Sequence, residues 1–295
     1  MSNHADSGED CMDCDVVATS LLREWANPGG EPFEMPPLEA LEDALAVNRA
    51  MATSSAAAGV GGHVGWKMGL KGAFAERPEL CGPLFGKGLL KDENDLSVLL
   101  SRLGVFSSEA EFGVFLKSKV KPRVERYTEE EVWACVGDIE MCIELCGARQ
   151  YQSTDRLAYV ADALLGCAVV RGKVIGTGED IDPNSLLDVK VRLLCGSEQI
   201  SSGNARNNPG DSVIASLTAL ANELCCERGL TLEAGTFVSC GHCCQASFGG
   251  RPSPNLAAAG EPKKEWGEVA AGSWEGKQLR AEFEGFGFVE VTLMK

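Results

Sequence analysis

Two acidic stretches decide how this chain folds: Glu-Ala-Glu-Phe-Gly-Val-Phe-Leu at residues 109–116 and Met-Cys-Ile-Glu-Leu-Cys-Gly-Ala-Arg at residues 141–149. Alternate side chains of a strand share a face, so Glu109 and Glu111 would project together while Ala110 turns the other way. Like charges this close are unfavourable unless a proton or a cation lies between them. Carboxylate oxygens suit a hard cation such as Mg2+ or Mn2+, and Glu144 in the second stretch would complete a three-carboxylate site.

A second interpretation of the same pattern is a solvated strand edge. The chain contains 43 Asp and Glu residues, so a Glu-x-Glu pair also arises without any ligand. Both acidic stretches nevertheless lie within apolar segments, and buried charges need a partner or a metal. The residues leave both interpretations open, and the apolar setting favours the metal site.

Composition limits the possible partners. With 295 residues, of which 44% are hydrophobic, the chain can bury a core as one large domain with an appendage or as two domains. The net charge of −16 argues against nucleic acid and anionic membranes as partners. No run approaches the roughly 18 apolar residues of a membrane span, and the first ten residues show no export signal. We therefore expect a cytoplasmic protein.

The 13 cysteines are expected to be mostly reduced thiols that pack as small hydrophobic residues. Two clusters, Cys11-x-x-Cys14 and Cys240-Gly-His-Cys243-Cys244, have spacings compatible with zinc. A zinc-stapled structural protein would require these two distant clusters to meet.

The pattern of apolar residues predicts three parts: a disordered tail at 1–15, a helical region at 16–62 and a strand-rich remainder at 63–295. Further helices are expected at Glu129–Val136 and Ser212–Arg228. Strands are expected at His63–Met68, Glu111–Leu116, Met141–Leu145, Gly166–Val170, Asp188–Leu194, Thr236–Ser239 and Arg280–Leu293. Strands with few helices between them indicate a mixed, β-rich α+β fold with an N-terminal helical layer.

Seven short motifs occur in one order along the chain: Gly-Trp-Lys-Met-Gly-Leu at 65–70, Gly-Pro-Leu-Phe-Gly at 82–86, the Glu-x-Glu pair, Ile-Glu-Leu-Cys-Gly-Ala-Arg at 143–149, Val-Ala-Asp at 160–162, Ser-Ser-Gly at 201–203 and Phe-Glu-Gly-Phe-Gly at 283–287. In order and spacing they resemble the fumarylacetoacetate hydrolase superfamily, in particular its 2-keto-4-pentenoate hydratase and 4-oxalocrotonate decarboxylase branch. The resemblance implies a fumarylacetoacetase-like catalytic domain over residues 63–295.

The resemblance also implies a site. A divalent cation, Mg2+ or Mn2+, would be held by Glu109, Glu111 and Glu144 and would act as a Lewis acid on a small 2-oxo-acid substrate. The remaining site residues implied are Lys67 and Asp162 as catalytic groups and Arg149 and Gly203 as substrate-binding groups. Each also has a structural interpretation. Lys67 could be a surface lysine and Asp162 a turn cap. Arg149 could form an ion pair with Glu144, and Gly203 could allow close approach to a neighbouring strand.

Three departures from the family pattern affect the expected pocket. Ala163 stands where the family typically has asparagine, Gly-Asp-Ser at 210–212 replaces Gly-His-Pro, and Thr236 follows Gly235 where an aspartate is usual. These changes remove polar groups, although His242 could replace a lost acid-base group. The metal carboxylates remain, so the sequence supports cation binding more firmly than any named turnover.

The leading functional hypothesis is hydration of 2-hydroxypenta-2,4-dienoate to 4-hydroxy-2-oxopentanoate. Decarboxylation of a 4-oxalocrotonate-like diacid and hydrolytic cleavage of an acylpyruvate use the same chemistry and stay open. A hypothesis of another class is a metal-binding homologue that has lost its chemistry and serves as a partner subunit. The resemblance further suggests a homo-oligomer, with a paralogous subunit as another partner.

Overall fold

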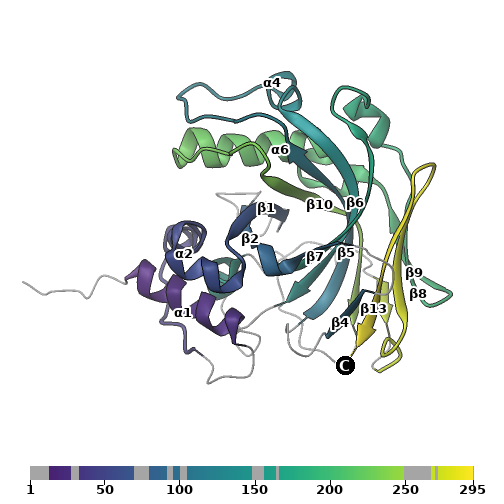
Figure 1. The fold of residues 1–295 in the computed structure, drawn as a ribbon, viewed down its shortest axis with the longest axis horizontal. Coiled ribbons are helices and arrows are strands. Elements are labelled where there is room, and N and C mark those ends of the chain that lie inside the picture. Colours follow the sequence, from purple (N-terminus) through teal and green to yellow (C-terminus); the bar gives the residue numbers. More distant parts are fainter. Residues whose placement is uncertain are drawn as a thin grey trace, which may run out of the picture.

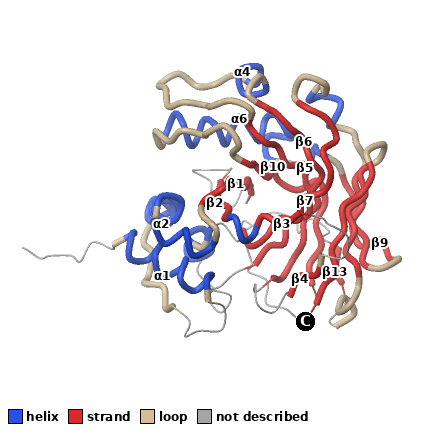
Figure 2. The backbone as a smooth tube through the Cα atoms, viewed as in Figure 1, coloured by secondary structure: helices blue, strands red, loops and turns tan. Residues whose placement is uncertain are grey.

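The computed structural model describes residues 13–27, 33–69, 80–91, 96–99, 105–147, 156–163, 166–248, 267–269 and 272–294. Strands dominate from residue 63 onward, and helices gather at the N-terminal end and along one edge (Figures 1 and 2). None of the helices in these ranges combines the length and the apolar character needed to cross a membrane.

A large mixed sheet positions the site. Its strand order is β2-β1-β10-β5-β6-β7-β3, with β11 paired to β10. The bounds are β1 His63–Gly69, β2 Leu80–Phe85, β3 Leu89–Lys91, β5 Val105–Leu116, β6 Val136–Gly147, β7 Gly166–Thr177, β10 Phe237–Phe248 and β11 Gly267–Val269. The pairs β10–β5, β5–β6 and β6–β7 are antiparallel, whereas β1 runs parallel to β10.

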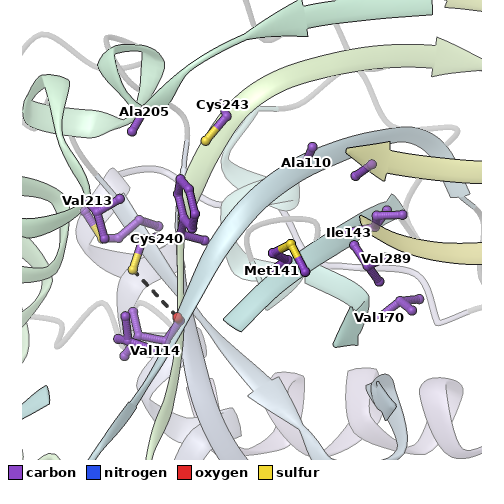
Figure 3. Packing of buried hydrophobic residues seen from close by; sticks show 14 of the residues in the cluster. Ala110, Val114, Met141, Ile143, Val170, Ala205, Val213, Cys240, Cys243 and Val289 are labelled. Atoms are coloured by element: carbon purple, nitrogen blue, oxygen red, sulfur yellow. Dashed lines mark hydrogen bonds between the residues drawn. The ribbon is translucent and has the colours of Figure 1, made fainter. Parts of the chain in front are cut away.

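A smaller sheet covers one face of the large one. Its order is β4-β13-β12-β8-β9, with bounds β4 Ser97–Leu99, β8 Val191–Cys195, β9 Glu198–Gly203, β12 Gln278–Phe283 and β13 Gly287–Met294. Between the sheets, Ala110, Met141 and Ile143 lie near Val289 (Figure 3), and the Phe112 and Phe283 rings are 5.1 Å apart. Each large apolar side chain buried here contributes about 1.5–3 kcal/mol.

The N-terminal helical layer is a separate packing unit. It comprises α1 Cys14–Ala26, α2 Leu41–Thr53, the 3-10 helix η1 Ser55–Val60 and, from later in the chain, α5 Arg156–Ala161. Asp13 caps α1 by accepting hydrogen bonds from two backbone N–H groups of the first turn. Asn48 of α2 donates to the Val160 carbonyl at 2.8 Å, which ties α2 to α5.

Two helices lie along the upper edge in Figure 1. They are α4 Glu129–Trp133 and α6 Val213–Ala221, which continues as the π-helix η7 Asn222–Glu227. Ser216 of α6 donates to the Cys240 carbonyl of β10 at 2.6 Å. Short 3-10 turns complete the fold: η2 Gly86–Gly88, η4 Pro183–Leu186, η5 Ala205–Asn207 and η6 Pro209–Asp211.

The predicted elements differ from the structure mainly at their ends. The predicted helix 129–136 ends at Trp133, and Val136 already begins β6. The predicted strand 280–293 is a hairpin, because Gly285 and Gly287 have positive φ angles of 83° and 121° that reverse the chain. The sequence did not indicate the short strands β2, β3, β4, β9 and β11, or helix α5.

Candidate metal and catalytic site

Strand alternation separates the acidic face of β5 from its core face. Ala110 and Phe112 turn toward the small sheet, which leaves Glu109 and Glu111 on the opposite face. In the antiparallel register Glu109 lies directly opposite Glu144 of β6. The same pleat that buries the apolar residues therefore gathers three carboxylates.

Curvature of the large sheet adds a cation to this group. Lys67 is on β1, and strands β10 and β5 lie between β1 and β6 in the sheet order. Its Nζ is nevertheless 2.5 Å from Oε1 of Glu144. Side chains from four strands, Leu84, Cys142, Val169 and Phe237, form a cluster inside the curl. The contact between Lys67 and Glu144 is thus made across the inside of the curved sheet.

The four charged groups are almost removed from solvent. Glu111 and Glu144 are fully buried, Lys67 is 4% exposed and Glu109 is 9% exposed. Three carboxylates and one ammonium leave two negative charges uncompensated, which one divalent cation would balance. Oε1 of Glu111 and Oε2 of Glu144 are buried and have no hydrogen-bond donor among the described residues. Charge and free oxygens therefore both fit a bound cation.

Hydrogen bonds hold one oxygen of Glu111 in place. The hydroxyl of Ser239 and the backbone N–H of Gly241, the latter at 3.1 Å, both donate to Oε2 of Glu111. The Cys142 thiol donates to the Glu111 carbonyl at 3.4 Å. With Oε2 held by β10, the free Oε1 is the oxygen available to a ligand.

The group best placed to share one ion differs from the predicted set. Ligand atoms of Glu109, Glu144 and Cys146 all lie within 4.8 Å of one another. Glu111 is not in this group, although it interacts electrostatically with both glutamates. The structure thus groups two of the three predicted carboxylates with a thiol and places Glu111 close enough to interact with both glutamates.

The electrostatics of the metal-free site follow from burial. Burial raises the pKa of Glu144 to about 7; Lys67 opposes this shift and Glu109 adds to it. Burial and then repulsion from Glu144 and Glu109 raise the pKa of Glu111 well above its usual range. Burial and the same charges raise the pKa of the Cys146 thiol. Protons therefore compete with a cation for these ligands.

Lys67 behaves differently from a lysine in an apolar pocket. Burial alone lowers the pKa of Lys67, but the surrounding acidic groups, Glu144 foremost, raise it above its ordinary value. The side chain is consequently an ammonium at neutral pH. In the metal-free site this ammonium neutralises part of the carboxylate charge.

His242 is a further titratable side chain at the site. It is half-buried on β10, pairs in register with Glu111 and places Nδ1 3.8 Å from Oε2 of Glu109. The replacement of a lost acid-base group by His242, considered from the sequence, stays a prediction.

Comparison with known proteins gives no match by sequence and a clear one by structure. No protein-family model matches the chain, and no curated protein sequence matches it. The 4-oxalocrotonate decarboxylase from Pseudomonas putida G7, complexed with magnesium and adipate, superposes with a TM-score of 0.72 and 21% identity, over 96% of this chain and 99% of that chain. Its complex with calcium and acetate superposes with a TM-score of 0.68 and 21% identity, over 94% of this chain and 97% of that chain. Fumarylpyruvate hydrolase from Pseudomonas aeruginosa, in complex with Mn2+ and pyruvate, superposes with a TM-score of 0.51 and 12% identity, over 78% of this chain and 89% of that chain.

The chain has the fumarylacetoacetate hydrolase fold. This confirms the predicted β-rich α+β fold with its N-terminal helical layer, because the match to the decarboxylase spans nearly all of both chains.

Within this fumarylacetoacetate hydrolase fold, the other predicted site residues lie in different settings. Arg149 falls outside the described residues. Asp162 is buried in the turn after α5, beside the helical layer. A Cβ on Gly203 would lie 2.1 Å from the Cys243 carbonyl, so this glycine permits close approach of β9 to β10. The catalytic role of Asp162 and the substrate-binding roles of Arg149 and Gly203 remain predictions.

The three departures from the family pattern occupy separate places. Ala163 is buried against the helical layer with a left-handed φ of 51°, a conformation that asparagine tolerates better than alanine. Asp211 is exposed before α6 with φ 64°. Thr236 precedes β10, and its carbonyl accepts from the Leu116 N–H at 3.0 Å. The structure therefore describes the surroundings of all three residues.

The cysteines of β10 do not gather as a zinc site within the described residues. Cys240 and Cys243 are buried near Val213 and Ala205 (Figure 3), where the Cys240 thiol donates to the Val238 carbonyl at 3.7 Å. Cys244 is buried on the same strand, Cys14 lies on α1, and Cys11 lies outside the described residues. The described cysteines form no disulfide with one another and most are buried, as predicted.

Two residues of the candidate site were missed by sequence reasoning. Cys146 carried a usable signal, because it stands two positions after Glu144 on the same strand and therefore on the same face. Ser239 carried none, because its approach to Glu111 depends on the pairing of β10 with β5, segments more than a hundred residues apart.

Proposed function

We propose that this protein is a divalent-metal-dependent lyase acting on a short 2-oxo acid. The observation that carries the proposal is the buried group of three carboxylates and one lysine, whose uncompensated charge and free oxygens fit one divalent cation. The resident cation, Mg2+ or Mn2+ among the candidates, would be held by Glu109, Glu111 and Glu144. Structural neighbours bound to magnesium and to Mn2+ support this proposal.

The chain's own groups define how the reaction would proceed. A bound cation would supply Lewis-acid polarisation of the substrate's 2-oxo group. The Lys67 ammonium orients Glu144 and places positive charge where negative charge develops on the 2-oxo oxygen. His242, beside Glu109, would give or take the proton at the substrate carbon that changes hybridisation. The buried setting strengthens each of these interactions by excluding water.

Of the three reaction outcomes that the sequence leaves open, hydrolytic cleavage of an acylpyruvate among them, two are favoured by particular observations. Decarboxylation of a 4-oxalocrotonate-like diacid is favoured by the nearly full-length likeness to 4-oxalocrotonate decarboxylase. Hydration of 2-hydroxypenta-2,4-dienoate, the outcome expected from the sequence, is favoured by His242, because adding water to a double bond requires a proton donor at the site.

The first test is calorimetric titration of metal-stripped protein with Mg2+ and with Mn2+, in the presence and absence of oxalate as an enolate mimic. We expect metal-dependent oxalate binding in the wild type and its loss in a Glu109→Gln, Glu111→Gln double variant. Glu198→Gln, an exposed acid of β9, is the matched control and should bind like the wild type. No oxalate binding in well-folded, metal-loaded wild type would contradict the catalytic proposal and leave a partner-subunit role ahead.

Turnover then separates the two outcomes. Release of CO2 from 4-oxalocrotonate identifies the decarboxylase. Loss of the conjugated-diene absorbance of 2-hydroxypenta-2,4-dienoate without CO2 release identifies the hydratase.

A further inference from the structure

Cys146 lies on β6 beside the carboxylates of the candidate metal site. It follows Glu144 by two residues and so projects from the same face of the strand. The side chain is buried, in a small cluster with Phe106 and Tyr159 at the end of the carboxylate group. Its thiol is free.

The geometry of Cys146 matches what one ion needs. A metal bonded to sulfur at about 2.3 Å and to oxygen at about 2.1 Å holds the two ligand atoms at most about 4.4 Å apart. The ligand atoms of Glu109, Glu144 and Cys146 all lie within 4.8 Å of one another. Small side-chain rotations therefore suffice to bring all three onto a single centre.

A second observation at this cluster is a set of buried carboxylate oxygens that could accept a ligand. Oε2 of Glu144 is fully buried with no hydrogen-bond donor among the described residues, and the same holds for the neighbouring Oε1 of Glu111. The ion pair of Lys67 within the described residues is made with the other oxygen of Glu144, Oε1. A buried carboxylate oxygen left open beside a thiol is a coordination position, because burying it without any partner is costly.

We propose that the Cys146 sulfur is a metal ligand, so that the centre is a mixed oxygen–sulfur site favouring thiophilic divalent cations such as Co2+, Zn2+ or Cd2+ over Mg2+. Thiolate ligands select softer cations, whereas carboxylates alone suit Mg2+ and Mn2+. The thiol proton passes to solvent as the cation binds, because the charge of the cation outweighs the effect of burial. This inference rests on the proposed function in one respect, that the same carboxylates hold the cation.

Cobalt spectroscopy tests the ligand directly, without any measurement of turnover. Metal-stripped wild type titrated with Co2+ should develop a near-ultraviolet thiolate-to-cobalt charge-transfer band that saturates with one bound ion. The band should disappear in Cys146→Ser and persist in Cys195→Ser, a matched substitution of a buried cysteine on β8 in the other sheet. Cys146→Ala, with circular dichroism as the check on folding, guards against an effect peculiar to serine.

The possible failures have different meanings. A charge-transfer band that survives in both Cys146 variants would assign the sulfur to another thiol and overturn the inference. Co2+ bound through Glu144, seen as visible absorption lost in Glu144→Gln, but without a charge-transfer band, would also overturn it while leaving the metal site intact. No Co2+ binding by folded wild type would overturn the metal site itself.

Competition between cations gives a second readout. We expect the affinity ratio of Cd2+ to Mg2+ to fall by about tenfold or more in Cys146→Ser, in line with the cost of removing a metal-site partner. An unchanged ratio would contradict the proposal. Mg2+ affinity itself should change little, because magnesium gains little from sulfur.

Discussion

At the scale of single residues, the site is a group of charges that the fold holds in an unfavourable arrangement. Glu111 and Glu144 lose water, crowd each other and receive only one ammonium, that of Lys67. In the metal-free protein protons relieve this repulsion, and in the loaded protein the cation does so. The carboxylates therefore link metal binding to both pH and stability.

This linkage predicts a pH dependence for Glu144. Its pKa is about 7 in the fold against an ordinary 4.5, so the folded state holds more protons between these values. Protonation of Glu144 therefore stabilises the metal-free protein at low pH, and this contribution is lost as pH rises from about 5 to 8. We expect wild type to lose stability relative to Glu144→Gln over this range, measured as the difference in Tm.

The comparison of the two proteins removes those titrations that Glu144 does not influence, such as that of His63. Burial lowers the pKa of His63 to about 4, which stabilises both proteins as pH rises. Added Mn2+ should raise the wild-type Tm more at pH 8 than at pH 5 and should have little effect on Glu144→Gln. A metal-induced shift that shrinks with rising pH would contradict this account.

Lys67→Gln should separate metal binding from turnover. Removing the ammonium takes away a competitor for Glu144, so metal affinity is retained or increased. The rate should fall by roughly 100-fold or more, because an electrostatic group facing developing charge is lost. Calorimetry and steady-state kinetics check the two effects, with a fall expected in kcat and little change in KM. Loss of both metal binding and folding would instead assign Lys67 a structural role.

At the scale of elements, the turn before α6 shows how backbone conformation constrains sequence. Gly210 and Asp211 are consecutive residues with left-handed φ angles of 68° and 64°. They lead into Ser212, whose hydroxyl accepts from the Ala215 N–H at 2.9 Å and caps α6. This turn also places Pro209 against Gly241, and the backbone N–H of Gly241 donates to Glu111.

Opposite effects are expected at these two neighbouring positions. Gly210→Ala would place a Cβ 2.7 Å from that of Ala215 and force alanine into a left-handed conformation. We expect a loss of about 1–3 kcal/mol, since the backbone conformation and the overpacking each carry a cost. Asp211→Gly, the matched control, should be neutral or stabilise by up to about 1 kcal/mol. Urea unfolding at constant m-value measures both, and equal losses at the two positions would argue against the proposed backbone conformation.

At the scale of the whole molecule, sequence and structure agree where local rules decide and differ where distant strands meet. Alternation along β5 was enough to place Glu109 and Glu111 on one face, and the core pattern was enough to predict a β-rich fold. The contact of Lys67 with Glu144 depends on how the sheet curves across two intervening strands. No local pattern encodes that curvature, and for the same reason Ser239 was not foreseen. Cys146 was overlooked because buried cysteines usually only pack.

Gly113 links the curvature of the large sheet to the geometry of the candidate site. It lies on β5 two positions after Glu111, and a Cβ there would lie 2.5 Å from the Phe237 ring. That ring belongs to the cluster inside the curl, with Leu84, Cys142 and Val169. Filling the space at Gly113 therefore displaces the packing that holds β1 and β2 over β6.

Gly113→Ala should consequently weaken both the fold and the site. We expect a loss of about 1–3 kcal/mol in the free energy of unfolding, the usual cost of overpacking a core, together with weaker Mn2+ binding, because Lys67 and Glu144 shift relative to each other. Gly59→Ala in η1 is the matched control: its Cβ would make an ordinary 3.5 Å contact with Ala26, so stability and metal affinity should change little. If Gly113→Ala lost stability while Mn2+ affinity stayed at the wild-type value, curvature of the sheet and assembly of the metal site would be independent. A parallel loss of both would show that packing inside the curl sets the geometry of the site.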